Sequence, residues 1–236
     1  MKMHRFYIGE MKIEKDFWIH DKTLVHQWTK VLRFKPDRKI VLFNDNQEQA
    51  LYKIADFRGQ GIRVVRLEIL DPASPRQDVY LCFSLLKKDK NDWVLQKATE
   101  LGVTQFIPLM CDRTEKVGFN EERARRIVTE ATEQCGRTDI PVIHEPQSVE
   151  SALKDLKNVK VLIAEQGALH LLSTNPQPQQ AVLVGPEGGW SDAEKQIFMD
   201  KKLDKLALGQ FTLRAETAAI TAAALLGHYS SAESLR

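Results

Sequence analysis

The sequence predicts an α/β protein in two parts: a small β-barrel of residues 1–71, then a domain of residues 75–236 built on a mostly parallel sheet. Short strands separated by tight turns fill the first 70 residues, as expected for a small barrel. From Val79 onward, apolar strands alternate with helical segments, which is the pattern of a parallel sheet covered by helices. Residues 71–75 between them carry two prolines and are interpreted as a linker, because each proline biases its predecessor to an extended backbone.

The N-terminal part is predicted to contain one helix and three strands. Residues 23–32 carry apolar side chains at helical spacing, with Trp28 and Val31 among them. Strands are expected at residues 39–43, 50–57 and 62–70, joined by turns at 44–46 and 59–61. The last strand alternates, so Leu67 and Ile69 are expected on its apolar face.

The C-terminal part alternates between strands and helices. Strands are expected at residues 79–85, 105–110, 142–143, 159–164, 181–184 and 205–208. Helices are expected at residues 92–101, 121–135, 149–156, from 192 onward, and at 215–230. Gly102 suits a left-handed helix cap, and Ser191 with Glu194 forms a capping box. Residues 174–180 are predicted to be a polar surface loop.

The composition is typical of a soluble globular protein, with 43% hydrophobic and 28% charged residues. No stretch approaches the roughly 20 apolar residues of a membrane-spanning helix, and the N-terminus lacks the apolar run of a signal peptide. Cys82, Cys111 and Cys135 form no C-x-x-C pair, so we expect buried free thiols, no metal site and a cytoplasmic location.

The charges are distributed unevenly along the chain. Residues 1–70 carry 14 Lys and Arg against 9 Asp and Glu, a balance of +5, whereas the whole chain carries only +2. A basic module beside a larger domain suggests that a polyanion is held next to a reaction site. An ordinary solvated surface explains the same charges equally well.

Two glycine-bearing stretches interrupt apolar runs in the last third of the chain. The first reads G-P-E-G-G at residues 185–189, directly after the strand at 181–184. Ligands of open α/β sheets bind outside the carboxyl ends of strands, so this loop is a candidate binding site. It matches neither the G-x-G-x-x-G nor the G-x-x-x-x-G-K-[ST] nucleotide pattern.

The residues of this first loop disfavour a triphosphate. Pro186 removes a backbone donor and Glu187 adds a negative charge. An adenosine-containing ligand with a cationic centre is compatible with such a loop. A tight turn that only leads into the Ser191 cap is the alternative interpretation.

The second stretch, residues 208–218, runs into an alanine-rich helix. Glu216 and Thr217 suit a first helical turn, because the helix dipole favours an acidic group there. Arg214 just before the helix is disfavoured by the same dipole, so its side chain is expected to face an anion or a carboxylate.

Three further stretches lie in order before the two loops. They read H-Q-W-T-K-V-L-R at residues 26–33, Q-K-A-T-E-L-G-V at 96–103 and E-A-T-E-Q-C-G-R at 130–137. Together with G-P-E-G-G at 185–189 and L-G-Q-F-T-L-R-A-E-T-A at 208–218, they resemble the RsmE family of bacterial 16S rRNA uridine-N3 methyltransferases. That family belongs to the SPOUT superfamily of knotted methyltransferases, and the resemblance covers essentially the whole chain.

The resemblance implies a fold and a cofactor. Residues 1–71 would form a PUA-like, RNA-binding barrel, and residues 75–236 a SPOUT methyltransferase domain with a trefoil knot. S-adenosylmethionine would bind in the knot loops. The implied cofactor-binding residues are Glu165, Gly185, Pro186, Glu187, Gly188, Gly189, Leu208, Gly209, Leu213, Arg214 and Thr217.

Catalysis needs a proton acceptor for uridine N3 or a group that stabilises charge on the uracil oxygens. Candidates are Arg214, Glu216 and Arg137, with Glu216 either orienting Arg214 or acting as the base. Glu133 and Arg137 are also spaced as an ordinary surface ion pair. The candidate contacts to RNA are Arg5, His26, Arg33, Lys87, Lys88, Arg113, Gln134 and Arg137, with Arg38, Lys90 and Lys116 on the same path.

The resemblance also implies partners, and this sequence departs from the family pattern at one point. The implied partners are 16S rRNA in the small ribosomal subunit and a second copy of the chain, with no membrane and no metal. The second loop of the family commonly reads L-G-x-R-I-L-R, whereas Phe211-Thr212 replaces Arg-Ile here. This change is expected to affect a contact to RNA or to the partner chain, because cofactor binding would rest largely on the backbone.

Two other classes of protein remain as alternatives. A nucleotide-hydrolysing or dehydrogenase enzyme is opposed by the missing glycine patterns. A non-catalytic RNA-binding or ribosome-assembly factor on a methyltransferase fold has the same sequence features, and only cofactor binding and activity separate it from an enzyme.

Overall fold

The computed structural model divides the chain into two compact units. Residues 1–74 and 132–139 form the first unit, and residues 75–131 and 140–236 form the second. The structure describes residues 3–75, 77–87, 89–114, 118–167 and 178–231. Residues 228–231 are described by their backbone only. The division after Ser74 falls within the predicted linker, but no sequence pattern indicated that residues 132–139 group with the first unit.

Two hydrogen bonds explain that grouping. The Glu133 carboxylate accepts from the backbone N–H of Tyr7 at 2.9 Å, and the Thr138 hydroxyl accepts from the backbone N–H of Ala73 at 3.0 Å. Both tie segments that are more than 60 residues apart in the sequence. Sequence periodicity describes local structure, so it carries no signal for such a contact.

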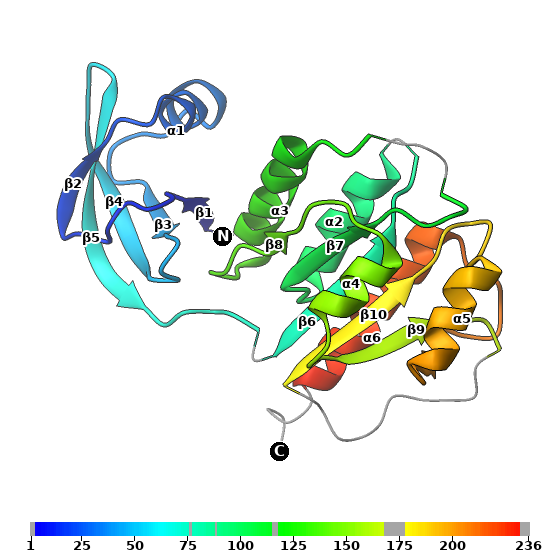
Figure 1. Cartoon of the computed structure of the whole chain (residues 1–236). Coiled ribbons are helices and arrows are strands. Elements are labelled where there is room, and N and C mark those ends of the chain that lie inside the picture. The colour runs from blue at the N-terminus through cyan, green and yellow to red at the C-terminus, as the bar shows by residue number, and fades with distance from the viewer. Residues whose placement is uncertain (1–2, 76, 88, 115–117, 168–177, 232–236) are drawn as a thin grey trace. The chain divides into compact units, whose positions relative to one another are not determined.

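The first unit is a mixed five-stranded sheet with one helical segment (Figure 1). Its strands follow the order β1-β3-β4-β5-β2, with β1 parallel to β3 and the other pairs antiparallel. The elements are β1 (His4–Tyr7), β2 (Asp16–Ile19), α1 (Lys22–His26), η1 (Gln27–Val31), β3 (Lys39–Phe43), β4 (Gln49–Arg58) and β5 (Gly61–Leu70). The first two strands were not predicted. Phe6, Trp28 and Tyr52 lie in the core of this unit.

Two predictions about apolar faces in the first unit are wrong. The predicted helix of residues 23–32 changes to a π-helix at Gln27, and the wider turn leaves Val31 64% exposed. In β5 the buried residues are Ile62 and Val64, whereas Leu67 and Ile69 are exposed. The β4–β5 pairing shifts register at two points, and such irregularities break the strict alternation on which the prediction relied.

The second unit contains a parallel six-stranded sheet with the order β11-β9-β10-β6-β7-β8. Its strands are β6 (Asp78–Ser84), β7 (Gln105–Leu109), β8 (Val142–Ile143), β9 (Lys160–Ala164), β10 (Gln179–Val184) and β11 (Asp204–Leu206). Its helices are α2 (Lys90–Glu100), α3 (Glu121–Cys135), α4 (Val149–Asp155), α5 (Asp192–Asp200) and α6 (Ala215–Ser231), and α3 ends in the first unit. The predicted α/β class with a mostly parallel sheet is therefore confirmed.

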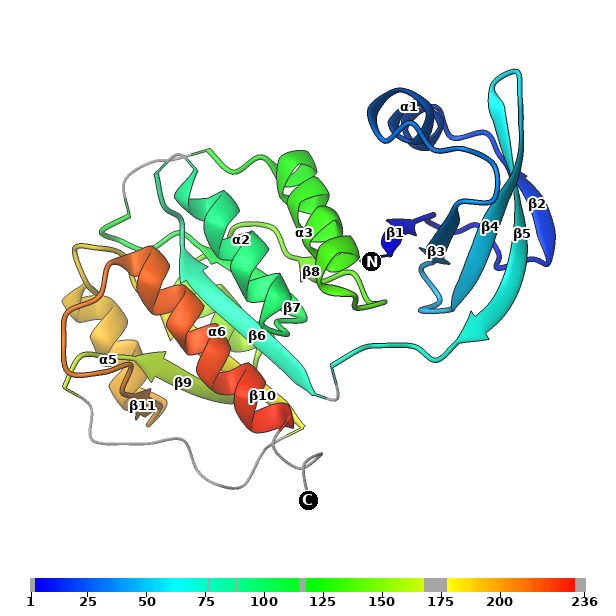
Figure 2. The ribbon, with the colours of Figure 1, turned by 180° about the vertical axis from the view of Figure 1, so that it is seen from behind.

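Two apolar cores lie on opposite faces of the parallel sheet. Alternate residues of β6 point to opposite faces, so Leu81 and Phe83 join one core and Cys82 joins the other. The first core includes α2, α3 and α6, which Figure 2 shows in front of β6. The second core includes α4 and α5, which lie on the opposite face in Figure 1.

Local sequence signals set the helix ends of the second unit as predicted. Gly102 has φ +94° just after α2, and Ser191 caps α5 in a capping box with Glu194. The predicted end of the surface loop of residues 174–180 is wrong, because β10 already begins at Gln179. Residues 174–177 of that loop lie outside the described residues.

Candidate active site

The candidate site lies at the carboxyl edge of the parallel sheet. Because all described strands of this sheet run in one direction, the loops that follow them meet at a single edge. The loop of residues 185–190 follows β10, and the loop of residues 207–214 lies between β11 and α6. These are the two glycine-bearing stretches that the sequence analysis singled out.

The 185–190 loop is packed tightly against its own tryptophan. A Cβ at Gly185 would lie 2.8 Å from Cε2 of Trp190, whose side chain is buried. No larger residue fits there without movement of the ring. The backbone N–H of Gly189 donates to the carbonyl of Pro186 at 2.8 Å, and Gly189 adopts φ +69°. The glycines of this loop therefore serve close packing and a left-handed backbone.

Polar contacts brace the same loop from the segment after β7. Arg113 donates from Nη1 to the carbonyl of Gly188 at 3.0 Å. The buried Glu194 accepts from the backbone N–H groups of Ser191 at 2.7 Å and Asp112 at 3.1 Å. The Ser191 hydroxyl also donates to Asp112 at 2.5 Å. The capping box at the start of α5 thus also joins two loops of the sheet edge.

The 207–214 loop makes fewer contacts within the part of the chain that the structure describes. Gly209 has φ +139°, and Thr212 donates from its hydroxyl to Oε1 of Gln166 in the loop after β9 at 2.9 Å. The carbonyl of Arg214 accepts from the backbone N–H of Ala218 at 2.8 Å and so begins α6. Phe211 is 73% exposed at the tip of this loop. The loop therefore presents an aromatic side chain and Arg214 to solvent.

One lysine connects the 185–190 loop with the start of α6. Nζ of Lys90, in the first turn of α2, lies 2.6 Å from Oε1 of Glu187 and 3.2 Å from Oε2 of Glu216. The first contact is a hydrogen bond, whereas the second is an ion pair in which Glu216 Oε2 lacks hydrogen-bond geometry. The side chain of Glu187 is 63% exposed and that of Glu216 only 7% exposed. Lys90 thus neutralises part of the charge of two carboxylates, one from the 185–190 loop and one from the first turn of α6.

The charges in this cluster favour ionised groups. The hydrogen bond to Glu187, followed by the interaction with Glu216, raises the pKa of Lys90. The same hydrogen bond from Lys90 holds the pKa of Glu187 below its usual range, and the positive charges of Lys87 and Arg214 act in the same direction. At neutral pH Lys90 is therefore a cation and Glu187 an anion.

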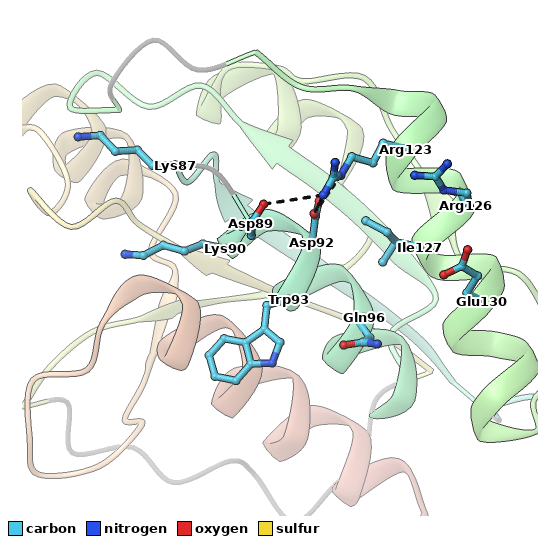
Figure 3. A pocket seen from close by; sticks show the side chains of 10 residues that line it. All are labelled: Lys87, Asp89, Lys90, Asp92, Trp93, Gln96, Arg123, Arg126, Ile127 and Glu130. Carbon is cyan, nitrogen blue, oxygen red and sulfur yellow. Dashed lines mark hydrogen bonds and ion pairs between the residues drawn. The ribbon is translucent and has the colours of Figure 1, made fainter.

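A broad cavity of about 990 Å³ adjoins Lys90. Side chains from the loop before α2, from α2 itself and from α3 line it, and Figure 3 shows Trp93 and Gln96 projecting from α2. Trp93 is 50% exposed. Arg123 is paired with Asp92, and Arg126 lines the same cavity from α3. The cavity thus combines an exposed aromatic ring with charged side chains of both signs.

The structure brings together most of the predicted cofactor-binding residues. The predicted residues of the 185–190 loop and of the 208–218 stretch lie at the same edge of the sheet, and Lys90 contacts one residue of each stretch. Leu208 packs against the apolar core, and Glu165 at the end of β9 pairs with Lys205 at 2.7 Å. Leu213 is partly buried, and Thr217 is exposed in the first turn of α6. Whether these residues bind a cofactor stays a prediction.

The predicted RNA contacts lie in different surroundings. His26, Arg33, Lys87 and Gln134 are exposed, and Arg33 adopts an unusual φ of +50°. Arg5 donates to Gln49 at 2.7 Å and lies over the ring of Phe43, and burial lowers its pKa. Arg113 contacts the first loop. Lys88 and Lys116 lie outside the described residues.

Arg137 has surroundings that differ from those of a catalytic group. Its side chain is 6% exposed and forms a two-point ion pair with Asp139. It belongs to the first unit, whereas Arg214 and Glu216 belong to the second. A buried, paired guanidinium favours a structural role, so the structure gives no support to the predicted catalytic and RNA-binding roles of Arg137.

The cysteines follow the prediction in two of three cases. Cys82 and Cys111 are buried, and burial raises the pKa of both thiols, that of Cys111 to about 12. Cys135 is exposed, so its predicted burial is wrong. Among the described residues, no group of three or more His, Cys, Asp and Glu could hold a metal ion. None of the described helices is long and apolar enough to cross a membrane.

Sequence reasoning missed the residues that join the loops. Lys90 was assigned to an RNA path, and Asp112 and Gln166 were not singled out. Their hydrogen-bond partners in this network lie 46 to 97 residues away in the chain. No spacing rule connects residues so far apart, and only the capping-box pattern at Ser191 pointed to one member of this network.

Comparison with known proteins identifies relatives along the whole chain. Residues 72–227 match the RNA methyltransferase domain family. Ribosomal RNA small subunit methyltransferase E of Rickettsia conorii is 32% identical over 97% of this chain and 98% of its own length.

Solved structures agree with that relationship. The structure of ribosomal RNA small subunit methyltransferase E from Neisseria gonorrhoeae, bound to S-adenosyl methionine, is 26% identical with a TM-score of 0.85. It matches 94% of this chain and 96% of its own. A methyltransferase from Legionella pneumophila, in complex with the same cofactor, is 26% identical with a TM-score of 0.81 and matches 96% and 97% of the two chains.

Proposed function

Because this chain belongs to the family of ribosomal RNA small subunit methyltransferase E, an RNA methyltransferase family, we propose that it methylates small-subunit ribosomal RNA with S-adenosylmethionine as the methyl donor. From the resemblance of the motifs, we further propose that the methylated atom is N3 of a uridine in 16S rRNA. The observation that carries the proposal is the pair of glycine-bearing loops at one sheet edge, linked through Lys90.

The loops suit a cationic cofactor better than a nucleoside triphosphate. They bring two carboxylates, Glu187 and Glu216, to a single lysine, and carboxylates repel the phosphates of a nucleoside triphosphate. Oε2 of the buried Glu216 accepts no hydrogen bond among the described residues, so it could pair with a further donor. The tight contact of Gly185 with Trp190 gives a fixed backbone for main-chain contacts to a flat ring.

We propose the following roles for the chain's own residues. Bound S-adenosylmethionine would supply an electrophilic methyl group on a positively charged sulfur. Glu216 would accept the N3 proton of uridine, so that N3 can act as the nucleophile. Arg214 stabilises negative charge that develops on the uracil oxygens.

RNA binding is proposed for both units. Residues 1–71 would act as a PUA-like barrel, which is supported by the mixed sheet and by the basic balance of this part. His26, Arg33 and Lys87 are exposed cations, or potential cations, suited to phosphate contacts. Arg5, Arg113 and Arg137 already contact other parts of the chain, so they are weaker candidates.

A trefoil knot in residues 75–236 and a homodimer complete the proposal. The knot is supported by the position of β10, which lies between β6 and β9 although both precede it in the chain. The dimer is supported by α6, an alanine- and leucine-rich helix, and by Trp93, which is half exposed on the neighbouring α2. An enzyme of ribosomal RNA would act in the cytoplasm.

One experiment tests the reaction directly. The protein is incubated with methyl-labelled S-adenosylmethionine and unmodified small ribosomal subunits or free 16S rRNA, and the RNA is then digested to nucleosides. Label in N3-methyluridine is the expected result. Label at uracil C5, at a ribose or in tRNA would contradict the N3 assignment.

A binding measurement separates the enzyme from its main alternative, a non-catalytic RNA-binding or assembly factor. Calorimetry with S-adenosylhomocysteine should give a measurable affinity in the wild type. RNA binding without cofactor binding at high micromolar concentration would favour the assembly factor instead.

A further inference from the structure

We propose that a lysine-lined groove at the amino edge of the parallel sheet is an RNA-binding surface, which holds the phosphate backbone of the substrate away from the reacting base. The inference rests on the proposed function and deepens it, because it assigns a second contact to the RNA of that reaction. The groove has a volume of about 630 Å³ and lies within the second unit. None of its described lining residues was a candidate site residue in the sequence analysis.

Two turns at the amino edge of the sheet form the groove. One turn leads from α4 into β9, which begins at Lys160, and the other leads from α5 into β11, which begins at Asp204. Strands β9 and β11 pair in parallel, with Asp204 beside Leu162, so the two turns lie side by side. Helices α4 and α5 cover the same face of the sheet (Figure 1), and both end next to the groove.

The floor of the groove is apolar and its rim is basic. Leu153, Leu156 and Val161 belong to the floor and are buried in the second core of this unit. Five exposed lysines line the same groove: Lys154, Lys157, Lys160, Lys201 and Lys202. A lysine can lay its methylene stem along an apolar surface while its ammonium group stays in water. The groove is therefore a hollow bordered by ammonium groups.

Carboxylates of the protein pair with two of the five lysines. Lys154 pairs with Glu150 at 2.9 Å, and Lys160 pairs with Asp204. The other three form no direct ion pair within the described residues: Lys157, Lys201 and Lys202. These three ammonium groups are available to an anion from outside the chain.

The positive charge is local to this groove. Residues 71–236 together carry 20 Lys and Arg against 23 Asp and Glu. The described lining of the groove has the opposite balance, with five lysines and Asp204 as its acidic member. The hydrogen bond and charge of Lys154 hold the pKa of Glu150 below its usual range, and Lys201 from the neighbouring turn acts in the same direction. One sign of charge along a concave surface attracts ligands of the opposite sign.

The helix ends explain only part of this arrangement. A lysine near the carboxyl end of a helix interacts favourably with its dipole, which accounts for Lys154 in α4 and Lys201 at the end of α5. Lys202 follows with φ +51°, a left-handed backbone in which glycine is usual after a helix. Its backbone N–H donates to the carbonyl of Met199 at 3.0 Å and closes the helix. Local structure thus favours glycine at position 202, so the lysine there is better explained by a use of its charge.

The chemistry of the lining fits phosphates rather than bases. The ammonium group of lysine is a point charge that pairs with phosphate oxygens. The described lining contains no aromatic side chain on which a base could stack. Contacts of this kind position a nucleic acid without reading its sequence. Because the chain belongs to an RNA methyltransferase family, RNA is the polyanion that matches this surface.

The groove and the candidate active site lie at opposite edges of the sheet. Strand β9 has five residues, so its two ends are about 15 Å apart. The RNA segment in the groove is therefore a different one from the target nucleotide. Helices α4 and α5 lie on the face opposite to α2 and α6, so the proposed dimer through α6 would leave them uncovered.

The test compares a single variant, a triple variant and a control. The single variant is Lys202→Gly, and the triple variant adds Lys157→Gln and Lys201→Gln. Lys195→Gln is the control for loss of one charge, because Lys195 is an exposed lysine of α5 that does not line the groove. Filter binding of free 16S rRNA at several salt concentrations gives the Kd and its salt dependence.

The triple variant should bind rRNA about tenfold or more weakly at about 150 mM salt. The slope of log affinity against log salt should fall by about two to three, because each phosphate contact contributes about 0.7–0.9. Lys202→Gly should lower the slope by about one without lowering the melting temperature, since glycine fits the left-handed backbone. Lys195→Gln should bind within about twofold of the wild type, because water and salt screen its charge.

Kinetics separate this surface from the active site. In the triple variant the KM for rRNA should rise by about tenfold, whereas kcat and the Kd of S-adenosylhomocysteine should match the wild type. A lower kcat with an unchanged KM would contradict a surface that only holds RNA.

A footprint on the wild type requires no substitution. Bound 16S rRNA should protect the amino groups of Lys157, Lys201 and Lys202 from reductive methylation, measured by mass spectrometry, and should leave Lys195 reactive. Equal reactivity of all four lysines with and without RNA overturns the proposal.

The binding data also distinguish this proposal from the proposed function. Wild-type affinity and salt slope in a folded triple variant overturn the RNA surface even if the wild type methylates rRNA. Groove-dependent binding by a wild type that transfers no methyl group would instead overturn the proposed function and retain the surface. A triple variant that binds free rRNA normally but small ribosomal subunits weakly would indicate a protein partner and overturn the assignment to RNA.

Discussion

The two glycine-bearing loops reach the same edge of the sheet but are held in different ways. The 185–190 loop packs against the buried Trp190, and contacts from Arg113 and the Asp112–Ser191–Glu194 network brace it. Among the described residues, the 207–214 loop has one side-chain bond to the loop after β9, and it exposes Phe211. The first loop is thus a fixed wall of the site, and the second is the wall that presents side chains to an incoming ligand.

The largest effect is expected for a substitution of Gly185, where the 185–190 loop packs tightly against Trp190. In Gly185→Ala the new methyl group would lie 2.8 Å from Trp190, and such overpacking costs about 1–3 kcal/mol. The melting temperature should fall by several degrees, and the affinity for S-adenosylhomocysteine by about tenfold or more. Thermal unfolding and calorimetry measure both.

Gly118→Ala is the matched control for this change. A Cβ at Gly118 would meet no atom within 4 Å, and its φ lies outside the left-handed region. Its melting temperature and cofactor affinity should match the wild type. Equal behaviour of Gly185→Ala and Gly118→Ala would show that the first loop is not the rigid wall described above.

A smaller effect is expected when the brace of the first loop is removed. Glu194→Ala deletes the acceptor for Ser191 and Asp112, and loss of such a buried cap costs about 1–2 kcal/mol. Amide hydrogen exchange of residues 185–190 should become faster. Ser148→Ala removes the cap of α4, which is not part of the Asp112–Ser191–Glu194 network, and should lower stability without changing exchange in the loop.

The smallest effect on stability is expected in the second loop. Phe211 is 73% exposed, so Phe211→Ala should change the free energy of unfolding by no more than about 0.5 kcal/mol. An exposed ring beside Arg214 is suited to stack on a base, which contributes about 1–3 kcal/mol. The KM for RNA should therefore rise by about fivefold or more, with the cofactor affinity unchanged.

Two comparisons sharpen that last prediction. Phe211→Trp should keep the KM of the wild type, because it retains an aromatic face. Met199→Ala, at an exposed site on α5, should change neither stability nor KM. A loss of cofactor affinity in Phe211→Ala, with an unchanged KM for RNA, would place this side chain at the cofactor instead.

Local patterns in the sequence were sufficient for much of the second unit. Buried parallel strands are continuous apolar runs, so β6, β7 and β9 could be predicted nearly to the residue. Caps act within one turn of a helix, which explains why Gly102 and the Ser191 box were also predicted correctly. The first unit was harder, because a π-helix and register shifts in β5 break the periods that such predictions use.

The sequence by itself determined the α/β class, the position of the two glycine loops and the motifs of the methyltransferase family. Only the tertiary structure decided which side chains meet there. It placed Lys90 between Glu187 and Glu216, paired Arg137 with Asp139 and inserted β10 between β6 and β9. The physical reason is range: backbone preferences and caps act over a few residues, whereas an ion pair depends on the packing of segments that lie about a hundred residues apart.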